Sequence, residues 1–241
     1  MKSNFQLYEY LKSFDRLDDI LAENDVSYEE VDAIPSRDKL TFTNGFYINC
    51  SAMFVDIRDS SSFPDKYKRP TLAKLYRSYA SEVTAVMNGN SDCAEVNIVG
   101  DCVSGIFNSQ LKIQIDSIFC TAATIWSLIK VFNYKLEKLK VDPISVGIGL
   151  SYGRALMIKA GYSGSGINEV VWTGDVVNDA SHLAGYGSAT YQDLPLMVSS
   201  AFYNNLNEHN SSLLRYNSSR GCYHGNVIII GMEEWFTANC K

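Results

Sequence analysis

The chain has 241 residues, of which 46% are hydrophobic and 20% charged, so it can bury the core of one large domain. Its formal net charge of −6 argues against nucleic acid or an anionic membrane as the main partner. The sequence shows no apolar run near the ~20 residues of a membrane span and no signal peptide, and its six scattered cysteines form no CxxC pair. We therefore expect a cytoplasmic protein with reduced thiols that binds neither nucleic acid nor a membrane.

The N-terminal segment predicts one amphipathic helix over residues 4–22. Leu7, Leu11, Phe14, Leu17 and Leu21 recur at helical spacing. We expect this helix to pack on the domain or on a dimer partner. A polar connection follows, and we assign residues 1–45 to an N-terminal helical extension.

The rest of the chain, residues 46–241, predicts a single α+β domain. Its order is strand, helix, strand, strand, helix, strand, which is that of a ferredoxin-like sheet with helices on one face. The hairpin in the middle turns at Gly100-Asp101. A strand near 168–172, a helix near 175–186 and a strand–helix–strand tail complete the prediction. The core elements are expected at 46–57, 70–86, 94–99, 102–107, 110–139 and 144–160, the last as one or two strands.

Two acids stand where this topology predicts a meeting point. Asp56 ends the first strand and Asp101 lies at the hairpin tip. Each alone could be a turn former or a helix cap, but facing carboxylates repel unless a cation lies between them. Oxygen ligands without nearby histidine or cysteine favour Mg²⁺ or Mn²⁺. Ser60, Ser61 and Ser62 would begin the next helix, where backbone amides attract anions.

Five motifs in order resemble the class III nucleotidyl cyclases, the adenylate and guanylate cyclase catalytic domain. They run from about residue 46 to 231 and read "FVDIRDSS", "NIVGDCVSGIF", "GIGLSYGRA", "WTGDVVNDASHLAG" and "PLMVSSAFYNNL" with the closing "SRGCYHGNVIII". The resemblance implies that Asp56, Asp101 and the carbonyl of Ile57 bind two Mg²⁺ or Mn²⁺ ions. It also implies that the amides of Ser60 and Ser61 hold the β- and γ-phosphates.

The same resemblance assigns residues to the other side of the site. Asn178 matches the asparagine that orients the ribose, and Arg220 falls where the family has a lysine on the triphosphate. In this family the acids come from one chain and the asparagine from the other. The resemblance therefore implies a homodimer with two equivalent sites.

Two positions depart from the family's catalytic pattern. His182 stands in place of the transition-state arginine, and Gly147 in place of an arginine just before G-I-H-x-G. A histidine is shorter and mostly neutral at pH 7, and on a helix it is often only packed or capping. The missing charge could come from Arg154 or Lys159, or catalysis could be weak.

Two further departures concern the base. Adenylate cyclases have lysine and guanylate cyclases glutamate where this chain has Asn97, and adenylate cyclases have aspartate where it has Val171. An amide offers donors and an acceptor, so Asn97 can pair with uracil or cytosine. The combination resembles the bacterial pyrimidine cyclases of the Pycsar anti-phage systems. It implies UTP, or else CTP, as substrate, a 3′,5′-cyclic pyrimidine monophosphate and pyrophosphate as products, and a separate effector that binds the cyclic nucleotide.

Three other interpretations remain open. A degenerate cyclase domain that binds nucleotide and dimerises without turnover would explain the missing arginine. An adenylate or guanylate cyclase with a rearranged base pocket would explain Asn97 and Val171. A ferredoxin-like interaction module would explain neither acid.

Overall fold

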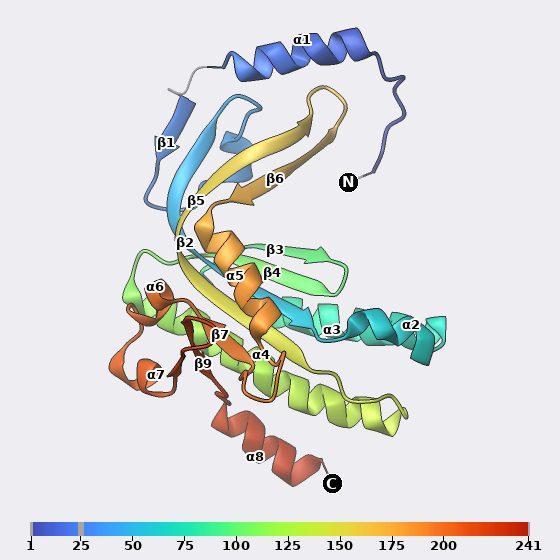
Figure 1. Ribbon diagram of the computed structural model, residues 1–241, viewed down its shortest axis with the longest axis vertical. Coiled ribbons are helices and arrows are strands. Elements are labelled where there is room, and N and C mark those ends of the chain that lie inside the picture. Colours follow the sequence, from blue (N-terminus) through green and yellow to red (C-terminus); the bar gives the residue numbers. More distant parts are fainter. Residues whose placement is uncertain (1, 24–26, 241) are drawn as a thin grey trace.

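The computed structural model describes residues 2–23 and 27–240. One sheet forms its centre, in the order β3-β4-β2-β5-β7-β9-β8, with β1 paired to β2 and β6 to β5 (Figure 1). The strands are β1 (Tyr28–Glu30), β2 (Gly45–Ile57), β3 (Cys93–Val99), β4 (Cys102–Asn108), β5 (Val146–Tyr162), β6 (Ile167–Thr173), β7 (Leu196–Val198), β8 (Arg215–Asn217) and β9 (Cys222–Gly225). The helices are α1 (Tyr10–Leu21), α2 (Phe63–Lys66), α3 (Arg69–Asn88), α4 (Lys112–Lys138), α5 (Asp175–Tyr186), α6 (Ser200–Tyr203), α7 (Glu208–Ser212) and α8 (Ile230–Asn239), with 3₁₀ turns η2 (Arg37–Lys39) and η3 (Ser60–Ser62).

The predicted βαββαβ core is confirmed as β2, α3, β3, β4, α4 and β5. The strand β2 lies between β4 and β5 and runs antiparallel to both. The last segment of this core, for which one or two strands were expected, is the single strand β5. The strand and helix expected after it are β6 and α5. The tail, for which strand, helix and strand were expected, differs: it is β7, α6, α7, β8, β9 and α8, so that a second helix, the strand β8 and the C-terminal helix α8 are added.

The two faces of the sheet are covered by different helices. Met53 and Val55 of β2 belong to the large core cluster that α3 and α4 close. Ala52, on the opposite face, packs in a second cluster with Val176 and Ala180 of α5. In Figure 1, α5 accordingly lies in front of the strands while α3 and α4 lie behind them. Because strand side chains alternate, Asp56 shares the α5 face with Ala52.

Two glycines of β5 allow α5 to lie directly on the sheet. A Cβ atom at Gly147 would lie 2.0 Å from the carbonyl oxygen of Ala184, and one at Gly149 would lie 2.0 Å from that of Ala180. The packing of α5 therefore explains the loss of the family's arginine at position 147, because no side chain fits there.

Gly149→Ala is expected to destabilise the fold by about 2–3 kcal/mol, because the added methyl group must push α5 off the strand. Gly153→Ala is the matched control on the same strand, since its Cβ would lie 3.5 Å from the Cβ of Val176, an ordinary contact. Urea unfolding of the two variants measures the difference. Equal midpoints for both would contradict the close packing of α5.

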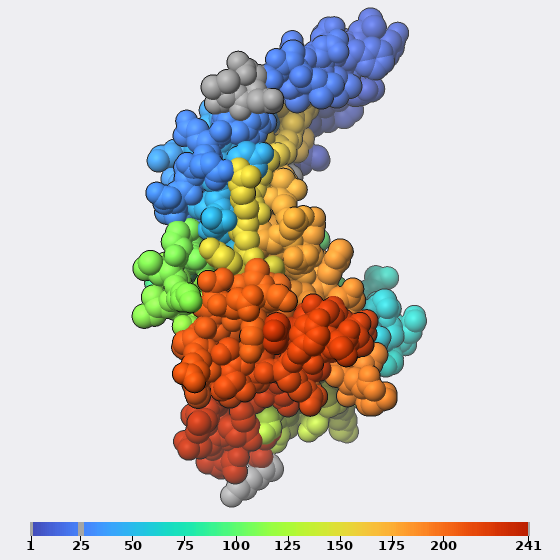
Figure 2. Space-filling view, turned by 60° about the vertical axis from the view of Figure 1, so that its left-hand side comes forward, coloured from blue at the N-terminus to red at the C-terminus, as the bar shows by residue number. Residues whose placement is uncertain are grey.

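The N-terminal extension differs in part from its prediction. The helix α1 covers residues 10–21 rather than 4–22, so Leu7 lies outside it, and the segment after it adds β1 to the sheet beside β2. No residue of α1 is buried: Phe14 is 55% and Leu17 52% exposed. The prediction that the apolar face of α1 packs on the domain is therefore wrong for the single chain. The helix lies beyond the end of the β5–β6 hairpin and forms the protruding blue end of the molecule in Figure 2. Packing on a dimer partner stays a prediction.

The expectation that no segment is apolar enough to span a membrane is also corrected. The helix α4 is 27 residues long and, by length and composition alone, is apolar enough to cross a membrane. Its Ile118, Phe119 and Ile125 are fully or almost fully buried in the main core. The apolar character of α4 thus has an explanation in the packing of this domain.

Candidate active site

The two acids meet at one edge of the sheet. Asp56 is the register partner of Cys102, the residue directly after Asp101. The pKa of the Asp56 carboxyl is raised by burial and, against the opposing effect of Arg58, by the nearby charge of Asp101. The prediction that distant acids come together is confirmed, and their mutual repulsion is present in the folded chain.

Arg58 is the cation that faces Asp56 in this structure. Its Nη2 donates a hydrogen bond to Oδ2 of Asp56, and its Nη1 donates to the carbonyl oxygen of Gly185 in α5 at 2.7 Å. Only 15% of the Arg58 side chain is exposed, against 34% for Asp56. Sequence reasoning gave Arg58 no role, although it stands between Asp56 and Asp59 in the chain.

The serine turn follows directly from the acidic strand. Ile57 is the last residue of β2 and is buried, and Asp59 adopts a left-handed backbone with φ 55°. Ser60 and Ser61 then begin η3, which the Ser62 hydroxyl closes by donating to the carbonyl oxygen of Asp59 at 2.8 Å. The structure therefore brings Ile57, Ser60 and Ser61 to the same edge as Asp56.

Asn178 and His182 lie on the exposed side of α5. They are four residues apart, so they share one side of the helix, while Val176 and Ala180 face the sheet. His182 also lines a cleft of about 390 Å³ together with Tyr186 and Arg220. The structure thus brings His182 and Arg220 together.

Arg220 is held in this cleft by Asp193. Its Nη2 and Nε donate to the two carboxylate oxygens at 2.7 and 3.2 Å, and its guanidinium lies 4.6 Å from the ring centre of Tyr186. The Asp193 side chain is 1% exposed and also accepts hydrogen bonds from Thr190 and Asn217. These hydrogen bonds lower the pKa of Asp193 to about 2, and the hydrogen bond from Arg220 has the largest effect.

Asp193→Asn is expected to destabilise the protein by about 1–3 kcal/mol, because the substitution removes the negative charge and one of the two acceptor oxygens to which Arg220 donates. The folded-state pKa of Asp193 lies below its ordinary value of 3.8, so this stabilisation is complete above pH 3.8 and is lost as the pH falls toward about 2. Urea midpoints of wild type and variant should differ by a constant amount from pH 5 to 8 and converge below pH 3.8. If the difference between the two urea midpoints grew as the pH fell, Asp193 would not stabilise the fold as a buried carboxylate.

The two positions assigned to the base lie on β3 and β6. The contact between these strands is made by Glu95 of β3, which accepts a hydrogen bond from Nε1 of Trp172 at 2.9 Å. Asn97 shares a side of β3 with Glu95. Val171 precedes Trp172, points to the opposite side of β6 and is 39% exposed.

Arg154 and Lys159 lie away from this cleft. Arg154 pairs with Glu30 of β1 and stacks 3.9 Å from the ring centre of Tyr47, and Lys159 lies 5.1 Å from that of Phe42. Both cations are engaged with the N-terminal half of the chain. The expectation that either replaces the missing arginine finds no support in this geometry.

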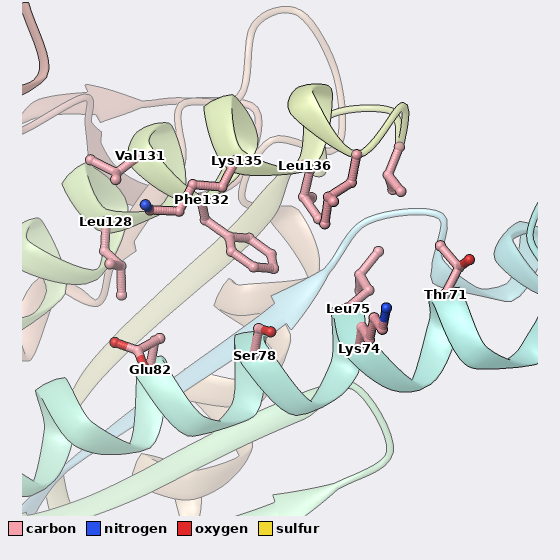
Figure 3. Close-up of a pocket in the computed structure, with 12 residues that line it drawn as sticks. Thr71, Lys74, Leu75, Ser78, Glu82, Leu128, Val131, Phe132, Lys135 and Leu136 are labelled. Atoms are coloured by element: carbon pink, nitrogen blue, oxygen red, sulfur yellow. The ribbon is translucent and has the colours of Figure 1, made fainter. Parts of the chain in front are cut away.

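A separate apolar groove of about 440 Å³ lies between α3 and α4. Figure 3 shows Leu128, Phe132 and Leu136 of α4 opposite Leu75 and Ser78 of α3. None of the residues assigned to the metals, the nucleotide or the ribose lines it. The groove is on the far side of the sheet from α5 and is not the site described above.

Comparison with known proteins decides the family. The model of the adenylate and guanylate cyclase catalytic domain matches residues 44–223. The chain belongs to this cyclase family. A protein of Gulbenkiania mobilis named uridylate cyclase is 39% identical over 216 residues, which are 87% of this chain and 83% of that protein. A second uridylate cyclase, of Treponema porcinum, is 36% identical over 95% of this chain and 80% of its own length.

Solved structures agree with the cyclase fold. A class III adenylyl cyclase-like ATP-binding protein from Pseudomonas aeruginosa superposes with a TM-score of 0.71 at 14% identity, covering 93% of this chain and 48% of that one. At this identity the likeness concerns the fold alone. The predicted ferredoxin-like core of the cyclase type is thereby confirmed.

Proposed function

We propose that this cyclase converts UTP to 3′,5′-cyclic UMP and pyrophosphate, with CTP as the alternative pyrimidine substrate. The observation that carries the proposal is the similarity to two uridylate cyclases over 87% and 95% of the chain. The amide of Asn97 and the apolar Val171 support it, because they replace the residues with which purine cyclases read the base.

The residues at the sheet edge fit a pair of divalent cations. Asp56 and Asp101 supply close carboxylates, and Asp56 already faces a cation in Arg58. We assign Asp56, Asp101 and the carbonyl oxygen of Ile57 to two Mg²⁺ or Mn²⁺ ions per site. Bound there, the ions would activate the ribose 3′-hydroxyl and offset negative charge on the phosphoryl oxygens.

The other groups bind and orient the nucleotide. The amides of Ser60 and Ser61 would hold the β- and γ-phosphates, and Arg220 would bind the triphosphate. Asn178 would orient the ribose so that its 3′-oxygen attacks the α-phosphorus in line with the leaving pyrophosphate. His182, in the same cleft as Arg220, would lie beside the reacting phosphate as the substitute for arginine.

The protein is proposed to act as a cytoplasmic homodimer. In each site the acids of one chain face α5 of the other, so neither chain is complete alone. Residues 46–241 form the catalytic domain, and residues 1–45 the extension, whose exposed α1 packs on the partner chain. The cyclic nucleotide is then a second messenger in anti-phage defence, bound by a separate effector protein.

The test is incubation of the purified protein with Mn²⁺ and each of ATP, GTP, CTP and UTP, with products identified by mass. Cyclic UMP as the main product supports the proposal, and cyclic CMP would assign the alternative substrate. Cyclic AMP or cyclic GMP would indicate a purine cyclase with an altered pocket. Nucleotide binding without any product would identify a degenerate domain, which the exposed His182 in place of arginine favours.

A further inference from the structure

Arg58 joins the metal acid to the helix that carries the ribose residue. Its Nη2 donates to Asp56, and its Nη1 donates to the carbonyl oxygen of Gly185 at 2.7 Å. The backbone amide of Arg58 donates to the carbonyl oxygen of Ser145 at 2.8 Å, which fixes the start of the side chain. Since the Arg58 side chain is only 15% exposed, the carboxylate of Asp56 and the carbonyl oxygen of Gly185 define where its charge lies.

The contact with Asp56 competes with metal binding. A guanidinium has donors and no acceptor, so it cannot act as a ligand, and its positive charge repels a divalent cation. It nevertheless compensates Asp56 while no metal is bound, which matters because Asp101 lies close to the same carboxylate. The Nε atom of Arg58 is buried without a hydrogen-bond partner, so the present position leaves one of its donors unused.

The contact with Gly185 lies at the end of α5. Carbonyl groups of the last helical turn have no partner within the helix, and a positive charge there is favourable. The guanidinium is thus shared between a carboxylate and a helix terminus. If the carboxylate is taken by metal ions, the helix terminus is the acceptor that remains.

We propose that Arg58 is the internal counter-ion of the metal site, which releases Asp56 when divalent cations bind and transmits their binding to the C-terminal turn of α5. This inference rests on the proposed function for the identity of the cations. Arg58 is here a positioning residue, acting through Asp56 and α5. In a two-chain site, the α5 that it contacts supplies Asn178 to the opposite active site, so metal binding at one site would reach the other.

The test compares Arg58→Met with wild type in the absence of nucleotide. Mn²⁺ binding followed by electron paramagnetic resonance should be about tenfold tighter in the variant, because one competing charge is gone. If Arg58 instead supported Asp56 as a metal ligand, the variant should bind Mn²⁺ more weakly, since loss of such supporting residues weakens metal binding by about 10–100-fold. Unchanged or weaker binding would therefore overturn the proposal.

Two further measurements keep the result independent of turnover. The melting temperature of Arg58→Met in EDTA should fall below that of wild type and rise more on addition of Mn²⁺. Hydrogen exchange at residues 182–187 should change with Mn²⁺ in wild type and not in the variant; equal changes in both would refute the link to α5. Arg77→Met, which removes a charge from the exposed side of α3, is the control and should match wild type.

Should Arg58→Met fail to fold, Arg58→Gln provides the same comparison, because it also removes the charge while keeping a hydrogen-bond donor, and its Mn²⁺ affinity should likewise exceed that of wild type. Affinity equal to or below that of wild type would count against the proposal. Because these assays need no substrate, a protein that turns over none of the four nucleotides would refute the proposed function while leaving the role of Arg58 decided by Mn²⁺ binding.

Discussion

Asp56→Asn is expected to lower kcat by about 10³-fold or more, which corresponds to ~4 kcal/mol of lost transition-state stabilisation. The amide keeps the shape of the side chain but removes the charge that would hold the cations. Initial rates of cyclic nucleotide formation with Mn²⁺ measure the loss. The fold should survive, because Asp56 is partly exposed and lies at the end of β2.

Asp59→Asn is the matched control for this experiment. Asp59 is an exposed acid three residues further along the chain, and the structure places it in the turn before η3. Its replacement by asparagine also keeps a residue that tolerates the left-handed backbone. A similar loss of activity in both variants, or near-normal turnover in Asp56→Asn, would contradict the assignment of Asp56 to the metals.

Mixing Asp56→Asn with Asn178→Ala is expected to restore about a quarter of wild-type activity, although each variant alone is nearly inactive. Random pairing gives mixed dimers in half of the population. In each mixed dimer one site receives both defects and the other receives neither, because in the proposed dimer the acids and the asparagine of a site come from different chains. Activity of the mixed preparation, after the subunits have been allowed to exchange, measures this restoration.

The control for the mixing experiment is Asp56→Asn combined with Asp101→Ala. Both changes fall on the same side of every site, so no mixed dimer contains an intact one and activity should stay at the level of the single variants. No restoration in the first mixture would show that each site is built within a single chain, and restoration in this control would show that the two acids of a site come from different chains.

The topology of the core could be predicted because its signals are local. Each strand of the βαββαβ unit is a short apolar run bounded by a turn, and Gly100-Asp101 marks the hairpin. The meeting of Asp56 and Asp101 then followed from strand order alone, since β2 is paired with β4. A helix beginning at residue 4 could not be judged in the same way, because an isolated short helix gains little from propensity.

The partners of the charged residues could not be predicted from the sequence. Arg220 is paired with Asp193, 27 residues away in a connecting segment, and Arg154 with Glu30, 124 residues away. No periodicity or spacing links such pairs, because they depend on how separate segments pack. The role of Arg58 was missed for a related reason: its second partner is a backbone carbonyl, which every residue carries.

The strand order separates what a cyclase must preserve from what it can vary. Asp56 is anchored on β2, which is paired on both sides, with β4 and β5. Asn97 and Val171 lie on β3 and β6, each of which pairs with one strand only among the residues described. Substitutions on such outer strands disturb few contacts of the framework. In the proposed function, a change of nucleobase preference would therefore need substitutions on these outer strands only and would leave the phosphate-binding residues at the end of β2 in place.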